Sequence, residues 1–308
     1  MTLMLLVHVI LIFFAALLFP SSAFAWGPGT HVELAMGALG AGAAIAPIIR
    51  DIIRKFPEAF IYGMASPDIV IGKKYAGYIH HCHNWRMGWL ILHEAETDRQ
   101  RAAAYGYLSH LAADVVAHNY FIPVKIVLSY DARLLSHTYW EMRFDLGVAD
   151  FAWDKLKMIT ELEIEEFDLL LERVLQKTLF SFSTNKRIFN SILMLQKMRG
   201  LRASLMLYAS KSRFEIEQEG REHYFDLALE SVLDFLSDPE KAPCLEIDPT
   251  GDKKISYAKN LRRRVREMVG REIMTQEDAG RLVELTREGL AVGLYRPDIR
   301  LPDVVDVL

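Results

Sequence analysis

The feature that most constrains this chain is a helical segment that is apolar on both faces and yet carries three ionisable side chains. Between Thr97 and Tyr120, apolar residues recur three and four positions apart, which is the periodicity of a helix. His110, Asp114 and His118 stand at positions i, i+4 and i+8, within roughly an 80° arc of one face. Their neighbours are apolar or alanine, so we expect a buried helix. Ionisable groups are costly there unless hydrogen bonds or a metal ion satisfy them.

The residue types on this helix favour zinc. Imidazole nitrogen and carboxylate oxygen are, after thiolate, its usual protein ligands. A further pair, His137 and Glu141, repeats the i, i+4 spacing. Alone, such a pair is equally typical of a hydrogen-bonded pair on a helix surface, but beside the first three residues it indicates a metal site.

Histidines are crowded in the first half of the chain. Of the ten, eight lie between residues 31 and 137, and three of these, His80, His81 and His83, flank Cys82. Adjacent residues point in different directions, so we expect one of the three to be a ligand and another to support the site or contact a substrate. The only other cysteine is Cys244, so at most one disulfide bridge is possible.

The segment from Phe56 to about Trp85 is rich in glycine and proline, which predicts an irregular loop. Asp68 lies in this segment directly after Pro67, where a carboxylate fits either a metal ligand or a turn residue.

The rest of the chain predicts helices, because few segments alternate apolar and polar residues. We therefore expect an all-α, multi-helix bundle with a helical core over residues 26–150 and a helical C-terminal half over 151–308. The expected helices span about 31–46, 47–55, 97–120, 136–145, 154–180, 186–212, 215–237, 256–269 and 276–290. With 51% hydrophobic residues the chain can bury a large core, and its formal net charge of -4 gives no reason to expect a general nucleic-acid binder.

Residues 1–25 are typical of a secretory signal peptide. An apolar run, Leu3–Phe19, is followed by the small-residue pattern Ala23–Ala25. We expect cleavage between Ala25 and Trp26, which would export the protein to the periplasm or the medium. An uncleaved anchor is the alternative, for which a run of about 17 residues is at the short end.

The order of these ligand-type residues resembles that of the zinc-dependent phospholipase C and P1/S1 nuclease superfamily. The residues that carry the resemblance are Trp26, His31, Asp68, His83, His110, Asp114, His118, His137 and Glu141. The resemblance implies an all-helical bundle of that type with three zinc ions. It also implies a mature chain that begins with Trp26, whose free amine and carbonyl oxygen chelate one ion.

The same resemblance implies how the ligands are shared among the three zinc ions. One ion is held by Trp26, His31 and Asp114. A second is held by Asp68, His110, Asp114 and a histidine of the 80–83 run, with His83 favoured and His81 second. The third is held by His118, His137 and Glu141. Asp114 bridges the first two, and only four residues separate it from His118, where the best-known members have a longer gap.

The implied chemistry is phosphodiester hydrolysis by zinc-activated water, with Asp68 orienting or deprotonating that water. The acidic net charge favours a glycerophospholipid at a membrane surface as substrate. An S1/P1-type nuclease or 3'-nucleotidase is the alternative, for which aromatic residues would stack on a base; the candidates are Trp85, Trp89, Tyr105 and Trp140. A non-catalytic, zinc-stabilised binding protein of the cell envelope is a third possibility, from another class.

Overall fold

The described part of the chain is entirely helical. The computed structural model describes residues 26–70, 82–132, 137–161, 164–175, 181–196, 216 and 218–308. No strand occurs in these ranges, which confirms the predicted all-α fold. The signal peptide expected over residues 1–25, and both His80 and His81, lie outside the described residues.

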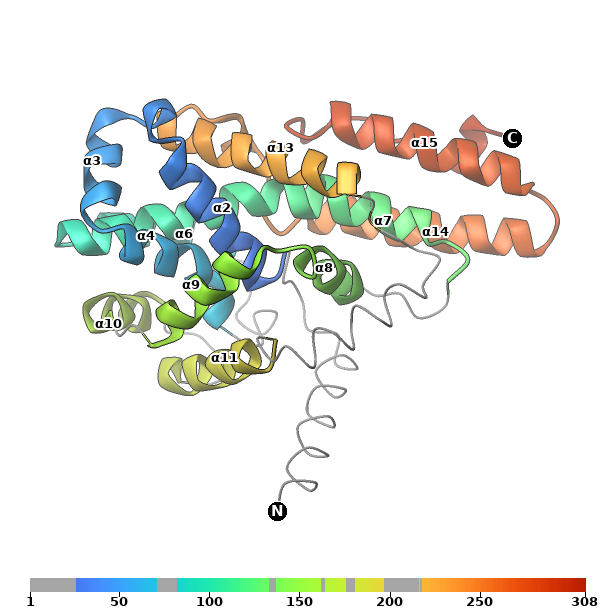
Figure 1. Ribbon diagram of the computed structural model, residues 1–308. Helices are drawn as coiled ribbons and strands as arrows, with labels where there is room; N and C mark the ends of the chain where they lie inside the picture. The colour runs from blue at the N-terminus through green and yellow to red at the C-terminus, as the bar shows by residue number, and fades with distance from the viewer. Residues whose placement is uncertain are drawn as a thin grey trace, which may run out of the picture.

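The described residues form thirteen α-helices (Figure 1). They are α2 (Pro28–Gly40), α3 (Pro47–Lys55), α4 (Pro57–Ala65), α5 (Trp85–His93), α6 (Asp98–Val116), α7 (Ile122–Leu128), α8 (His137–Asp145), α9 (Asp150–Glu161), α10 (Glu165–Val174), α11 (Phe182–Gln196), α13 (Gln218–Ser237), α14 (Asp252–Gly270) and α15 (Gln276–Val292).

Helix α6 is buried, as the sequence predicts, and it lies at the centre of the fold. Thr97 caps it, and a capping box with Gln100 satisfies backbone groups at its start. Helices α4, α5 and α13 pack around it. The continuous helical stretch Asp98–Leu128 is long and apolar enough to cross a membrane, but 89% of its most apolar window is buried inside the structure. Its composition therefore agrees with its place in the core.

The prediction of an irregular loop from Phe56 onward is wrong at its start, because α4 begins at Pro57. Proline suits the first turn of a helix, because the backbone N–H groups there have no hydrogen-bond partner within the helix and proline lacks this group. Gly63 is not a helix breaker here but a contact point. A Cβ at Gly63 would lie 1.9 Å from the Ala103 carbonyl oxygen, and one at Gly106 would lie 2.0 Å from that of Phe60. The α4 and α6 backbones therefore touch.

The sequence predicts that the helix over 97–120 ends before Pro123. This prediction is also wrong, because the chain stays helical through Pro123. A π-helical turn, Ala117–Phe121, links α6 to α7, and Pro123 lies in the first turn of α7, where it is tolerated. The turn contains His118. Such π turns are rare and often mark functional sites.

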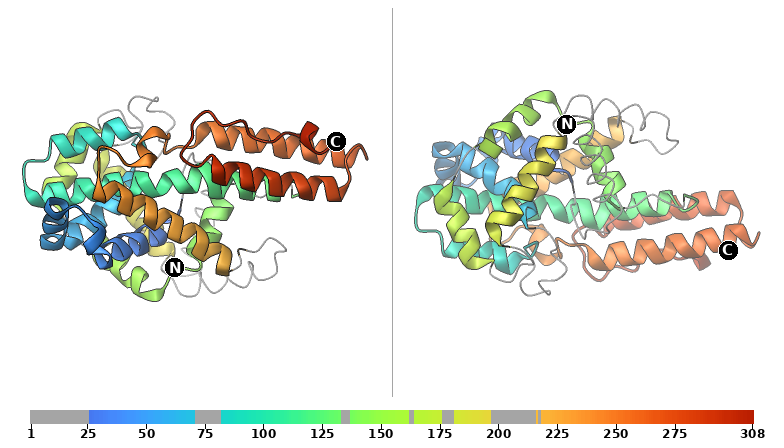
Figure 2. Two further views of the ribbon diagram at one scale, coloured as in Figure 1. Left: turned by 90° about the horizontal axis from the view of Figure 1, so that it is seen from above. Right: turned by 90° about the horizontal axis from the view of Figure 1, so that it is seen from below.

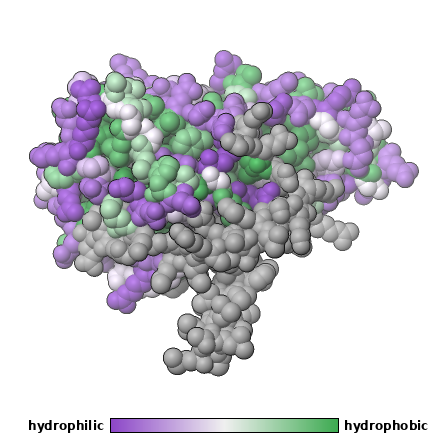
Figure 3. All heavy atoms as spheres, in the orientation of Figure 1, coloured by the Kyte–Doolittle hydropathy of each residue, from purple (hydrophilic) through white to green (hydrophobic). Residues whose placement is uncertain are grey.

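The second half of the chain packs back on the first. The helix expected over 154–180 is divided into α9 and α10, whereas α13 lies close to its expected range and packs on α6. Helices α14 and α15 run side by side along α7 and extend beyond the rest of the molecule (Figure 2). The face drawn in Figure 3 mixes hydrophilic and hydrophobic side chains. Cys82 and Cys244 are both buried free thiols.

Candidate metal centre

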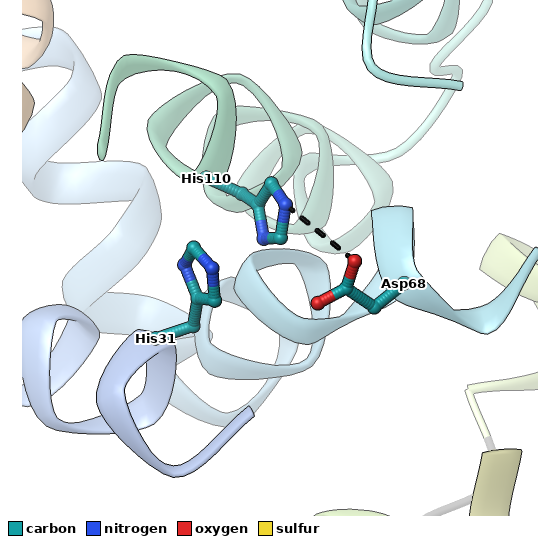
Figure 4. A group of neighbouring side chains, drawn as sticks. All are labelled: His31, Asp68 and His110. Atoms are coloured by element: carbon teal, nitrogen blue, oxygen red, sulfur yellow. Dashed lines mark ion pairs between the residues drawn. The ribbon is translucent and has the colours of Figure 1, made fainter. Parts of the chain in front are cut away.

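Five buried ligand-type side chains meet on one side of α6, and we call them the α6 cluster. They are His31, Asp68, His83, His110 and Asp114. Helix α2 supplies the first, the 3-10 turn Ser66–Ile69 after α4 the second, and the residue before the Asn84 cap of α5 the third. Figure 4 shows His31, Asp68 and His110 pointing toward one another from three separate elements.

Asp114 lies at the middle of the α6 cluster and faces two sides of it. Its Oδ1 is 3.4 Å from His31 Nε2. Its Oδ2 is 3.2 Å from His83 Nε2 and also 3.2 Å from His110 Nε2. A bridging carboxylate needs this arrangement, with one oxygen directed to each side. Asp68 completes the second side, with Oδ1 3.3 Å from His83 Nε2 and 3.9 Å from His110 Nε2.

A second group of ligand-type side chains, His118, His137 and Glu141, lies next to the first, and we call it the α8 cluster. Its ligand atoms all lie within 4.8 Å of one another. His137 Nε2 is 2.9 Å from Glu141 Oε1, and the rings of His118 and His137 are 5.2 Å apart. His118 Nδ1 is 4.0 Å from Asp114 Oδ2, which places the two clusters side by side.

Backbone carbonyl groups orient two of the imidazole rings. His110 Nδ1 lies 2.8 Å from the Met64 carbonyl oxygen, and His118 Nδ1 lies 2.6 Å from that of Pro249. A carbonyl oxygen only accepts, so each Nδ1 carries the proton and donates it. In the neutral ring, Nε2 then has the lone pair that a metal ion requires.

The buried polar atoms of these clusters fit a bound cation. Among the described residues, several buried ligand atoms make no hydrogen bond of regular geometry and instead face other ligand atoms at 2.9–3.4 Å. They are both carboxylate oxygens of Asp114, His31 Nε2 and His137 Nε2. Unpartnered buried polar atoms are uncommon in native proteins, so a concentration of them needs an explanation. Zinc accounts for it, because imidazole and carboxylate are its ligands.

Protonation states also suit a cation. Burial lowers the pKa of His110 to about 4, against the opposing charge of Asp114, and burial likewise lowers that of His118 to about 4. Burial, assisted by the charge of Lys259, lowers the pKa of His137 to about 3. Burial opposes ionisation of Asp114, but the charge and hydrogen bonding of His110 outweigh it and hold the Asp114 pKa well below its ordinary value. The imidazoles of His110 and His118 are therefore neutral beside the Asp114 carboxylate anion, which is the state in which imidazole binds a metal ion.

Trp26 lies in the core next to the α6 cluster. Its ring stacks on Phe144 at 5.1 Å and is 6.4 Å from the His31 ring. The expected chelate through its amine stays a prediction, as does the sharing of ligands among ions. His81, the second choice for the loop ligand, lies outside the described residues.

Asp145 is a structural residue of the site that sequence reasoning missed. Its carboxylate accepts hydrogen bonds from the backbone N–H of Gly29 at 3.3 Å and from the Thr30 N–H and hydroxyl at 2.8 and 2.7 Å. It thereby caps the start of α2 from α8. A Cβ at Gly27 would lie 2.2 Å from the same carboxylate, so a larger residue here would displace the Asp145 side chain from α2.

The comparison with protein families gives one match. Residues 30–181 match the family model for zinc dependent phospholipase C, which confirms the resemblance drawn from the sequence. Every predicted ligand except Trp26 falls within this range. No curated protein matches the chain. No solved structure matches it either.

Proposed function

Since the chain belongs to the zinc-dependent phospholipase C family, we propose that it is an exported phospholipase C that cleaves glycerophospholipids at a membrane surface. The products would be diacylglycerol and a phosphorylated headgroup. The observation that carries this proposal is the pair of adjoining buried clusters, whose donor atoms are those of zinc sites.

The proposed ligand sets follow the geometry of Asp114. The Trp26 terminus, His31 and Asp114 would hold one ion. Asp68, His83, His110 and Asp114 would hold a second. The α8 cluster would hold a third. When bound, zinc supplies charge neutralisation at the phosphate, a more acidic water and stabilisation of the leaving alkoxide.

Asp68 is the proposed proton acceptor. Its carboxylate is buried at the edge of the α6 cluster, near the Nε2 atoms of His83 and His110. A carboxylate held there can orient a water molecule toward phosphorus and take its proton at a carboxylate oxygen. The carbonyl-bound His110 ring stays neutral beside it, so it does not compete as an acid.

The packing of the aromatic residues supports a lipid substrate over a nucleic acid. Trp140 is fully buried. Trp85 donates its indole N–H to the Ile247 carbonyl oxygen at 2.8 Å, and Trp89 packs on Phe235. Trp140 is therefore not available to stack on a base, and the packing of Trp85 and Trp89 restricts their rings, whereas Tyr105 is half-buried.

The test is metal analysis of protein that begins at Trp26, followed by parallel assays on phosphatidylcholine vesicles and single-stranded DNA. We expect zinc to copurify, phosphocholine to be released, and turnover to stop on chelation and return with zinc. Asp68→Asn should lower turnover at least 100-fold, while the exposed Asp51→Asn control should not. Cleavage of DNA without lipid turnover would assign the nuclease activity instead, and zinc binding without either activity would favour the binding protein.

A further inference from the structure

We infer that the turn Asp248–Gly251, which lies beyond the matched family region, is the positioning element of the α8 cluster. We call it the 248–251 turn. The inference rests on the proposed function, because it assigns the turn a role at the third zinc ion. The predicted ligands all precede it by more than a hundred residues, so the sequence alone did not connect it to the site.

The contact that carries the inference is the 2.6 Å hydrogen bond from His118 Nδ1 to the Pro249 carbonyl oxygen. His118 is fully buried, and its Nε2 has no partner within the described part of the chain. The carbonyl fixes both the tautomer and the rotation of the ring, and it leaves Nε2 as the nitrogen with a lone pair for a metal ion in the α8 cluster. Without it, the ring would keep its position on the chain but lose its orientation.

Orientation from outside is needed because His118 lies in the π-helical turn. Regular helix geometry, which places His110 and Asp114 on one face, is interrupted at Ala117. The direction of the His118 ring is therefore not set by helix periodicity alone.

The 248–251 turn is itself held rigidly. The Asp248 carboxylate accepts from the Thr250 N–H at 3.0 Å and from the Thr250 hydroxyl at 2.8 Å. The Asp248 carbonyl oxygen accepts from Asn119 Nδ2 at 2.9 Å, which joins the turn to the residue after His118. These bonds fix the Pro249 carbonyl against the π-helical turn.

Gly251 makes the close approach possible. Its φ of 60° lies in the left-handed region, which favours glycine. A Cβ at this position would also lie 2.4 Å from the His118 carbonyl oxygen. The residue is thus required both for the conformation of the turn and for its distance from His118.

The experiment is zinc titration of the full mature chain carrying Asp248→Ala, with a competing chromophoric chelator. Loss of the two turn bonds should weaken one zinc ion by about 10- to 100-fold and leave the others unchanged. Asp248→Asn keeps an acceptor oxygen and should lie near the wild type. The matched control is Asp278→Ala, whose carboxylate makes the same kind of bonds to Thr275 at the start of α15.

The outcomes separate the two proposals. A wild type that binds three ions, with an Asp248→Ala variant that binds all three equally well, would overturn the inference. So would equal weakening of all ions, or the same loss in Asp278→Ala, because the turn would then act through general stability. A wild type that binds fewer than three ions would contradict the three-ion assignment of the proposed function itself, and the role of the turn with it.

Discussion

The two carboxylate oxygens of Asp114 connect His31 on one side of the α6 cluster with the histidines on its other side. One carboxylate oxygen faces His31 and the other faces His83 and His110. The residue is fully buried and its pKa stays well below the ordinary value, so it remains an anion without solvent. A buried carboxylate in this position is stabilised most strongly when a cation lies next to each of its two oxygens.

Asp114→Asn should therefore lose metal at two positions, whereas Glu141→Gln should loosen only the ion of the α8 cluster. An amide keeps the shape of the side chain but removes the charge and one acceptor. Zinc content per chain, measured after gel filtration, distinguishes the variants. Loss of the same single ion from both would refute the bridging role.

The metal-free protein should lose stability as the pH falls from about 6.5 to about 4. The pKa values of His110 and His118 are lowered to about 4 and that of His137 to about 3 in the folded chain, while unfolded histidine titrates near 6.5. In this window the unfolded state binds more protons, so the free energy of unfolding decreases with decreasing pH, by an amount on the order of several kcal/mol.

Urea denaturation of the chelated protein across this range measures the effect. His118→Asn should reduce the slope, whereas substitution of the exposed His223 should not. A slope that is the same in all three proteins would show that the buried imidazoles do not cause it.

At the scale of elements, the backbones of α4 and α6 touch at Gly63 and Gly106. Gly106→Ala should cost about 3 kcal/mol or more of unfolding free energy, because the new methyl group meets the Phe60 carbonyl at 2.0 Å. Gly280→Ala, the same change within α15 with open space around it, should stabilise by about 0.5–1 kcal/mol. Chemical denaturation measures both. Equal effects at the two positions would contradict the backbone contact.

The start of α2 depends on α8 through Asp145. Asp145→Ala removes the acceptor of three hydrogen bonds from Gly29 and Thr30 and should destabilise the protein by about 3 kcal/mol. It should also weaken zinc at His31, which α2 carries. Calorimetry and zinc titration measure the two effects. The exposed Asp154→Ala on α9 is the control and should change neither.

Helices with local signals were predictable and those set by packing were not. The capping box at Thr97 and the proline at Pro47 mark their helix starts in the sequence. Gly63 suggested a loop because glycine is ambiguous: it breaks an isolated helix but permits close contact in a packed one. The continuation of α6 through the π-helical turn had no sequence signal, since Pro123 is compatible with either an end or a restart.

At the scale of the whole molecule, the site is assembled from both halves of the chain. His110, Asp114, His118, His137 and Glu141 were identifiable from their i, i+4 spacing, whereas Trp26, His31 and His83 were assigned through the family resemblance. The contacts of Asp145 with Thr30 and of Pro249 with His118 join residues 115 and 131 positions apart in the sequence. The periodicity of a helix predicts contacts only between residues a few positions apart, so it could not reveal these. Side chains that supply ligands can thus be read from sequence more readily than the groups that orient them.

Export and activity should be coupled through Trp26. A free amine can bind zinc, but an amide nitrogen in an uncleaved chain is planar and a very poor ligand. Protein with a tag fused before Trp26 should bind less zinc and turn over slowly, and proteolytic release of the Trp26 terminus should restore both. Mass spectrometry verifies the terminus. Full activity of the extended protein would exclude the chelate but not the histidine clusters.

The hydrogen bond between His118 and Pro249 also bears on the order of events during synthesis. Translation proceeds from the N-terminus, so His118, His137 and Glu141 leave the ribosome well before the carbonyl that orients His118. The N-terminal helices can fold while the rest is being made. On the proposed function, the third ion would bind at full strength only once the 248–251 turn has been made and has packed against His118. A lipid-cleaving enzyme completed in this way would reach its full activity only after most of its chain has been made.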